Sequence, residues 1–247
     1  NSIRDSRMSV ARNTLVQSSL TLGSRILGMV RDILLIAKIG AGPIGDAWAT
    51  AQQFPNLFRR IFAEGAFASA FVPTYARTLE AEGMEAARDV AQEALRVLFA
   101  ATAALTILAQ IFMPWVLLLI HGGQADDPES YGLAVLLTRI TMPYLTFMAI
   151  AALLSGVLNS AERFILSAGV PTLLNLSLIP AAFVAPDAKG TALAAAMAYF
   201  VAGVLQAGAL WWGVNRQKVR LSLIGWPRMT PAVKKVLKLA IPGTIAA

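Results

Sequence analysis

The stretch Ile140–Ala161, ITMPYLTFMAIAALLSGVLNSA, contains no Asp, Glu, Lys or Arg. Three further stretches share this property: Val97–Gln124, Phe164–Pro186 and Gly190–Asn215. An α-helix rises about 1.5 Å per residue, so each stretch is long enough to cross the ~30 Å hydrocarbon core of a bilayer. Buried helices of soluble proteins are rarely this long without a charge. The four stretches therefore predict an all-α, polytopic membrane helix bundle.

The overall composition excludes most soluble classes of protein. Hydrophobic residues make up 57% of the 247 residues and charged residues 14%, against about 25% charge in a typical soluble domain. Too few polar groups remain to cover a water-facing surface, which argues against a soluble enzyme, a disordered chain or a free nucleic-acid binder. The chain has no Cys and a single His, which excludes disulfides, thiolate metal sites and multi-histidine sites.

Two earlier apolar stretches are interrupted by charges. We interpret Thr14–Ile39 and Asp46–Tyr75 as spans one and two, which brings the expected bundle to six transmembrane helices. The last stretch begins a seventh span but is too short to cross, so the chain is expected to be part of a longer protein. The expected organisation is a cloning remnant or disordered start at 1–7, a six-helix N-terminal lobe at 8–215, a basic cytoplasmic loop at 216–232 and a truncated seventh helix at 233–247.

The net charge of +7 orients the expected bundle. Most Lys and Arg residues fall in the N-terminal segment and in every second loop, above all in residues 216–238. The intervening loops are mostly acidic, and none has a basic excess. Because cytoplasmic loops of membrane proteins are enriched in Lys and Arg, the N-terminus is predicted to be cytoplasmic.

Six charged residues lie inside the predicted spans one and two: Arg25, Arg31, Asp32, Arg59, Arg60 and Glu64. A charge at mid-membrane costs ~2.5–3.5 kcal/mol on insertion scales, so such residues face the bundle interior or a water-filled cavity. Arg25 and Arg31 are six residues apart, which places them ~120° apart around a helix. Asp32 shares a face with Arg25 rather than with Arg31, and it can pair with an arginine of a neighbouring span.

The excess of arginine in these spans favours an anionic substrate. Guanidinium groups match phosphate oxygens with two hydrogen bonds and stay charged at any pH, so a phosphate or diphosphate is the favoured ligand. Pro55 removes a backbone donor and Gly65 adds flexibility, so span two is expected to open beside a water-accessible cavity. Three more polar residues could line this cavity or serve only in helix packing: Arg139, Asn159 and Asn175.

The alternative for the charged residues is an internal network that only fixes helix packing. It applies most to Arg60, Asp32 and Glu64, which can compensate one another's charge. Enzyme signatures such as a nucleophile elbow, a phosphate-binding loop or a zinc-binding His-Glu-x-x-His motif are missing from the sequence. The sequence therefore favours a transporter over an enzyme.

Three stretches together resemble one family of transporters. They are Ser24–Asp32 (SRILGMVRD), Pro55–Phe67 (PNLFRRIFAEGAF) and Val236–Pro242 (VLKLAIP). They resemble the MurJ (MviN) family, the bacterial lipid II flippases of the multidrug/oligosaccharidyl-lipid/polysaccharide exporter superfamily. The resemblance runs from about Met8 to the last residue, and it covers the first half of a family whose members carry about fourteen spans.

The resemblance implies two six-helix lobes facing each other across a central cavity, with this chain supplying the N-terminal lobe. The implied substrate is lipid II, an undecaprenyl-pyrophosphate-linked peptidoglycan precursor moved from the inner to the outer leaflet of the bacterial cytoplasmic membrane. By this resemblance Arg25, Arg31 and Arg59 would hold the pyrophosphate. The positions expected to act in gating or a charge network are Ser24, Asp32, Asp46, Arg60 and Glu64, and the expected hinges are Gly28, Pro55 and Gly65.

The implied mechanism is alternating access by rocking of the two lobes. No cofactor and no metal are expected in this chain, and a coupling cation would bind in the part of the protein beyond it. The expected partners are lipid II, membrane lipids, the C-terminal lobe and the cell-wall synthesis machinery, with no nucleic acid. The alternatives are an exporter of another lipid-linked oligosaccharide, an enzyme acting on polyprenyl phosphates, and a non-transporting membrane scaffold for cell-wall synthesis.

Overall fold

The computed structural model describes residues 2–62, 66–120, 127–161 and 163–245. These residues form helices joined by turns, and no β-strand occurs among them, as the sequence predicts. In chain order the helices are α1 Ser2–Ile39, α2 Pro43–Phe62, α3 Ala66–Glu82, α4 Met84–Ile120, α5 Pro128–Thr141, α6 Tyr144–Ser160, α7 Phe164–Gly169, α8 Pro171–Val184, α9 Ala188–Arg216 and α10 Pro231–Ile245.

Four helical segments among the described residues are long and apolar enough to cross a membrane. They are α4, α5 with α6, α7 with α8, and α9, and each overlaps one of the four charge-free stretches of the sequence. Helices α1 and α2 are not among them, because both carry several charges within their apolar parts. The all-helical membrane architecture is therefore supported, whereas the expected count of six spans is not confirmed.

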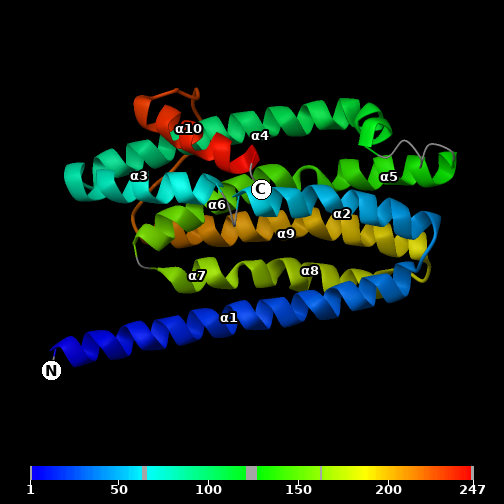
Figure 1. Cartoon of the computed structure of the whole chain (residues 1–247), viewed down its shortest axis with the longest axis horizontal. Coiled ribbons are helices and arrows are strands. Elements are labelled where there is room, and N and C mark those ends of the chain that lie inside the picture. Colours follow the sequence, from blue (N-terminus) through cyan, green and yellow to red (C-terminus); the bar gives the residue numbers. More distant parts are fainter. Residues whose placement is uncertain (1, 63–65, 121–126, 162, 246–247) are drawn as a thin grey trace.

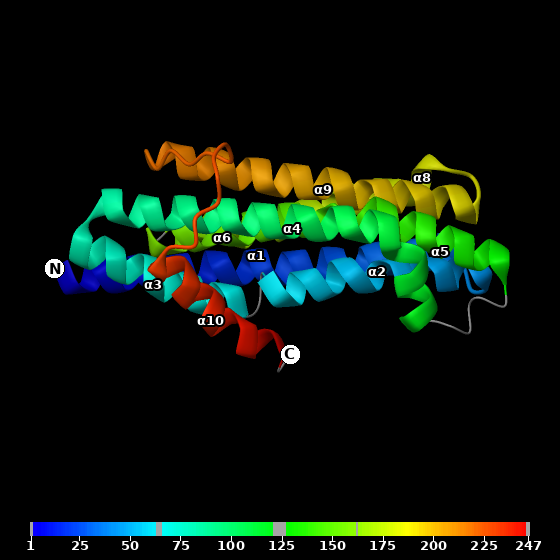
Figure 2. The same ribbon diagram turned by 90° about the horizontal axis from the view of Figure 1, so that it is seen from above.

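Several connections between described helices lie at two opposite ends of the bundle (Figure 1). The α1–α2 and α8–α9 turns are at one end, and the N-terminus, the α3–α4 turn and the segment 217–230 are at the other (Figures 1 and 2). The basic segments that the sequence assigns to one side of the membrane thus lie at one end of the molecule. That this end faces the cytoplasm stays a prediction.

Local sequence signals explain where helices begin. The α1–α2 turn contains Gly40 and Gly42 with φ of +75° and +108°, values that glycine adopts without strain. The Asp127 carboxylate accepts hydrogen bonds from the first backbone N–H groups of α5 at 3.2 and 3.4 Å. The Thr230 hydroxyl accepts from Val233 N at 3.3 Å at the start of α10. Asp127 and Thr230 therefore cap the helices that follow them.

The expected second span consists of two helices in the structure. Helix α2 ends at Phe62, α3 begins at Ala66, and the two lie end to end (Figure 1). The opening expected at Pro55 is wrong, because α2 is helical on both sides of this buried proline. A proline removes only one backbone donor, and packing against neighbouring helices keeps the rest of the helix in place.

Small residues close the seam between α6 and α9. A Cβ atom added to Gly203 of α9 would lie 2.9 Å from Cβ of Phe147 of α6, closer than real contacts allow. Beside it, the rings of Tyr144 and Tyr199 meet edge to face with 5.5 Å between their centroids. Ala202, the neighbour of Gly203 on α9, is fully buried. This seam is packed as tightly as the backbone permits.

The segment 217–230 is fastened to the first turns of α4. Three side chains one helical turn apart donate hydrogen bonds to carbonyl oxygens of every second residue of the segment: Arg88 to Arg220 (3.0 Å), Gln92 to Ser222, and Arg96 to Ile224 (2.9 Å). Every fourth residue of a helix is about 6 Å apart, and every second residue of an extended chain is about 6.6 Å apart, so the two spacings match. We call this arrangement the α4 clamp.

Helix α10 packs against α3 beyond the α4 clamp. Val233 and Val236 of α10 are buried in one apolar cluster with Val219 and Leu221 of the segment 217–230. Phe71 and Tyr75 of α3 belong to the same cluster, and the α3–α4 pair, the segment and α10 therefore form one packed unit.

Candidate functional site

Two cavities open beside the arginines of α1 and α2. The first, of about 390 Å³, is lined by Arg25, Arg59 and residues of α3, α6, α7, α8 and α9. The second, of about 480 Å³, is lined by Arg31, Asp32, Arg59 and residues of α1, α2 and α9. We call them the Arg25 cavity and the Asp32 cavity. Arg59 lines both, so it stands where the two cavities meet.

The C-terminal half of α1 carries Arg25 and Arg31, and the last turn of α2 carries Arg59. Gln52, Asn56 and Arg59 follow one another at intervals of four and three residues, so they form a polar stripe along α2 that faces the Asp32 cavity. On α1, the six-residue spacing of Arg25 and Arg31 turns them toward different cavities, as the ~120° separation predicts.

Arg31 has its charge compensated by its own neighbour. Asp32 Oδ1 accepts from Arg31 Nη2 at 2.7 Å and from Nε at 2.8 Å. The Arg31 side chain is 15% exposed and that of Asp32 is 49% exposed. The sequence places Asp32 on a different face from Arg31 and indicates that it can pair with an arginine of a neighbouring span. In the structure Asp32 pairs with Arg31, because the long arginine side chain can fold back along the helix to reach the adjacent carboxylate.

Asn175 of α8 connects Arg31 to Ser24. Its Oδ1 accepts from Arg31 Nη1 at 2.9 Å, and its Nδ2 donates to the Ser24 carbonyl at 2.8 Å and lies 3.4 Å from the Ser24 hydroxyl. Asn175 is 4% exposed. A Cβ atom added to Gly28 would make an ordinary contact of 3.6 Å with Asn175 Oδ1, so Gly28 lies beside this amide with room for a methyl group. Ser24, Gly28 and Arg31 thus share the face of α1 that contacts α8.

Arg25 differs from Arg31 in having no carboxylate partner among the described residues. Within the described ranges, no carboxylate lies within ion-pair distance of Arg25, and its side chain is exposed. None of the described residues that line the Arg25 cavity is acidic. Arg25 and Arg59 therefore give this cavity a positive potential, which is what a phosphate or diphosphate requires.

The remaining predicted residues lie elsewhere. Arg60 is exposed, and neither cavity includes it among its described lining residues. Asp46 is in the first turn of α2, about 20 Å along the helix from Arg59, so the structure does not bring it to the arginines. Glu64 and Gly65, predicted for the charge network and as a hinge, lie outside the described residues.

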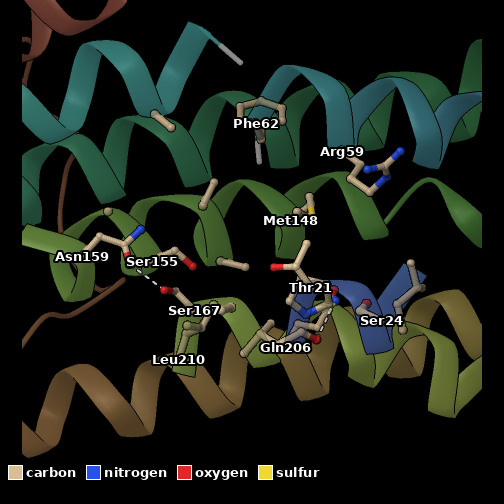
Figure 3. A pocket seen from close by; sticks show the side chains of 18 of the residues that line it. Thr21, Ser24, Arg59, Phe62, Met148, Ser155, Asn159, Ser167, Gln206 and Leu210 are labelled. Atoms are coloured by element: carbon tan, nitrogen blue, oxygen red, sulfur yellow. Dashed lines mark hydrogen bonds between the residues drawn. The ribbon is translucent and has the colours of Figure 1, made fainter. Parts of the chain in front are cut away.

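Neutral polar residues complete the Arg25 cavity, and the sequence pattern does not single most of them out. Thr21 and Ser24 of α1, Ser155 and Asn159 of α6, Ser167 of α7 and Gln206 of α9 line it (Figure 3). Serine, threonine and glutamine are common in membrane helices as packing residues, so only the folded arrangement reveals that they share a cavity. Arg139, considered as a lining residue, is not among the described residues of either cavity.

The described residues contain no group of three or more His, Cys, Asp or Glu side chains that could hold a metal ion. The groups that line the cavities can recognise an anion through ion pairs and hydrogen bonds from guanidinium groups. Hydroxyl and amide groups beside them can add further hydrogen bonds.

Comparison with known proteins decides the family. Residues 36–247 match the family described as "Lipid II flippase MurJ". The chain belongs to this family. It is 42% identical to a probable lipid II flippase MurJ of Rhizobium tropici, over 96% of this chain and 45% of the relative. A lipid II flippase MurJ of Burkholderia cenocepacia is 38% identical over 97% of this chain and 47% of the relative.

Solved structures agree with this membership of the MurJ family. A lipid II flippase MurJ in an inward closed conformation matches with a TM-score of 0.75 and 26% identity, over 94% of this chain and 47% of that protein. A multidrug transporter of the MOP superfamily in an outward-facing conformation matches with a TM-score of 0.70 and 15% identity, which shows the fold alone. The chain spans just under half the length of its MurJ relatives. Membership of this family and the four apolar helices make it a membrane protein.

Proposed function

We propose that this chain supplies the N-terminal six-helix lobe, residues 8–215, of a lipid II flippase, with Arg25 and Arg59 binding the diphosphate of the substrate. The observation that carries the proposal is that these two guanidinium groups line one cavity that has no acidic side chain among its described lining residues. Lipid II carries a diphosphate, and its handling is the activity for which the relatives are named.

Arg31 takes a different part in the same proposal. Its donors are engaged by Asp32 and Asn175, so it holds α1 against α8 and keeps Asp32 at the edge of the second cavity. We propose that the Arg31–Asp32 pair acts in gating: a diphosphate arriving at Arg59 competes with Asp32 for Arg31. Such an exchange gives the substrate a different affinity for two states of the lobe, which alternating access requires.

The membrane setting completes the proposal. The N-terminus and the segment 216–232 face the cytoplasm, the protein lies in the bacterial cytoplasmic membrane, and transport runs from the inner to the outer leaflet. Residues 233–247 begin the helix that leads to a C-terminal lobe, and a coupling cation is bound outside this chain. The basic segments gathered at one end of the bundle support this orientation (Figure 1).

The test is lipid II translocation by the intact protein reconstituted into vesicles. Arg25→Ala and Arg59→Ala should each lower the rate at sub-saturating lipid II by roughly 10–100-fold, because a hydrogen bond to a charged group contributes about 1.5–3 kcal/mol. Arg77→Ala is the matched control, since Arg77 is an exposed arginine of α3 that donates to Pro73 O within its own helix. Wild-type rates in both cavity variants would disprove the proposed diphosphate site.

A further inference from the structure

The Arg25 cavity has a second polar end that the proposed diphosphate contacts leave unused. Ser155 and Asn159 lie one helical turn apart on α6, and Ser167 faces them from α7. Figure 3 shows this group on the opposite side of the cavity from Arg59, with Met148 between the two ends. We call Ser155, Asn159 and Ser167 the amide–hydroxyl cluster.

The cluster presents hydrogen-bonding groups that the described part of the chain does not use. The Ser167 hydroxyl donates to Asn159 Oδ1 at 2.5 Å, which fixes the amide (Figure 3). The amide nitrogen of Asn159 and the hydroxyl of Ser155 make no hydrogen bond to any described residue. Both side chains are half-buried and line the cavity, so these groups can hydrogen-bond a ligand that both donates and accepts.

The size and wall chemistry of the cavity define that ligand further. A volume of about 390 Å³ is at the lower end of the ~300–1,000 Å³ typical of small-molecule sites, so it suits one ring-sized group. Phe62 and Met148 add apolar wall area between the polar ends. No acid and no lysine is among the described lining residues, which favours a neutral group over a charged peptide.

We propose that the amide–hydroxyl cluster binds a sugar ring of the substrate whose diphosphate is held by Arg25 and Arg59. A sugar ring offers hydroxyl groups that donate and accept, together with an apolar C–H face for Phe62. The inference rests on the proposed function, because it places the sugar by its attachment to the diphosphate. It assigns substrate selectivity to α6 and α7, apart from the guanidinium groups of α1 and α2.

The test compares two ligands on the intact protein: lipid II, and undecaprenyl diphosphate, which has no sugar. Ser155→Ala with Asn159→Ala should weaken lipid II binding about tenfold, since two neutral hydrogen bonds together contribute about 1.4 kcal/mol. Undecaprenyl diphosphate affinity should change less than twofold. Ser160→Ala is the matched control, because Ser160 is also on α6 but donates to Gly156 O within the helix.

The single variant Ser155→Ala removes no hydrogen bond between described residues, so it should fold like the wild type. It should weaken lipid II binding about threefold. An equal loss for both ligands, or no loss for lipid II, would overturn the sugar site. The proposed function fails differently: Arg25→Ala and Arg59→Ala would then leave the binding of both ligands unchanged. Loss of both ligands in the arginine variants, with loss of lipid II alone in the cluster variants, supports both proposals.

Discussion

The seam between α6 and α9 and the seam between α1 and α8 are built in opposite ways. At the first, glycine and alanine bring two backbones together, and Gly203 has no room for a Cβ atom. At the second, Ser24, Arg31 and Asn175 join the helices through hydrogen bonds, and Gly28 has room to spare. Both cavities lie beside α1. The contrast teaches that one part of the bundle is packed for rigidity, while the polar part leaves space for a ligand.

Gly203→Leu should disrupt the packing between α6 and α9 and cause the largest loss of stability among these variants. The new side chain would meet Phe147 and Tyr144 of α6, and overpacking of this kind costs about 3 kcal/mol. We expect a clear fall in the thermal unfolding midpoint of the intact protein in detergent. Gly208→Leu is the control, because Gly208 is on the same helix with nothing within 4 Å of an added Cβ. Equal stability of the two variants would show that the seam is not closely packed.

Asn175→Ala should loosen the polar seam by a smaller amount. The substitution leaves Arg31 Nη1 and the Ser24 carbonyl without their partner, at about 1 kcal/mol for hydrogen bonds between membrane helices. The free energy of unfolding measures the loss. Ser177→Ala on the same helix should be neutral, since no hydrogen bond of that side chain is found in the described residues. A neutral Asn175→Ala would mean that the network does not hold α1.

Gly28→Ala should change the stability of the protein in the opposite direction to Gly203→Leu, which sharpens the comparison of the two seams. The added Cβ makes an ordinary contact of 3.6 Å with Asn175 Oδ1, and alanine stabilises a helix interior by about 0.5–1 kcal/mol relative to glycine. The unfolding midpoint should rise. The predicted hinge role of Gly28 is tested at the same time: transport that falls while stability rises supports a hinge, and unchanged transport contradicts it.

Ser24→Ala should change the stability of the protein least among these variants. Its hydroxyl lies 3.4 Å from Asn175 Nδ2, whereas the stronger 2.8 Å bond goes to its backbone carbonyl, which alanine retains. The free energy of unfolding should change by less than about 0.5 kcal/mol. A loss as large as that of Asn175→Ala would show that the hydroxyl, and not the backbone, connects α1 to α8.

Much of the fold could be predicted from where charges are missing. The stretch Ile140–Ala161 and its three counterparts correspond to long apolar helices, because only a lipid-facing or deeply buried helix can lack charge over that length. The caps at Asp127 and Thr230 could also be predicted, since side-chain caps act within a few residues. The continuity of α2 through Pro55 could not, because one proline does not decide whether a packed helix continues.

The site was predicted in its residue types but not in its pairing. That Arg25, Arg31 and Arg59 line cavities follows from the cost of burying a charge. The neutralisation of Arg31 by Asp32 depends on side-chain rotamers, which helical periodicity does not fix. The amide–hydroxyl cluster depends on α6 and α7 meeting across a turn, and no spacing in the sequence encodes that meeting.

The α4 clamp has a mechanical consequence. The segment 217–230 is hydrogen-bonded to α4, and α10 packs against α3. A displacement of α10 therefore cannot be taken up by a loose linker before it reaches these helices. Helix α3, against which α10 packs, also contacts α2, the helix that carries Arg59. A displacement at the C-terminal end of this chain can therefore reposition one of the two guanidinium groups of the Arg25 cavity without passing through the rigid α6–α9 seam.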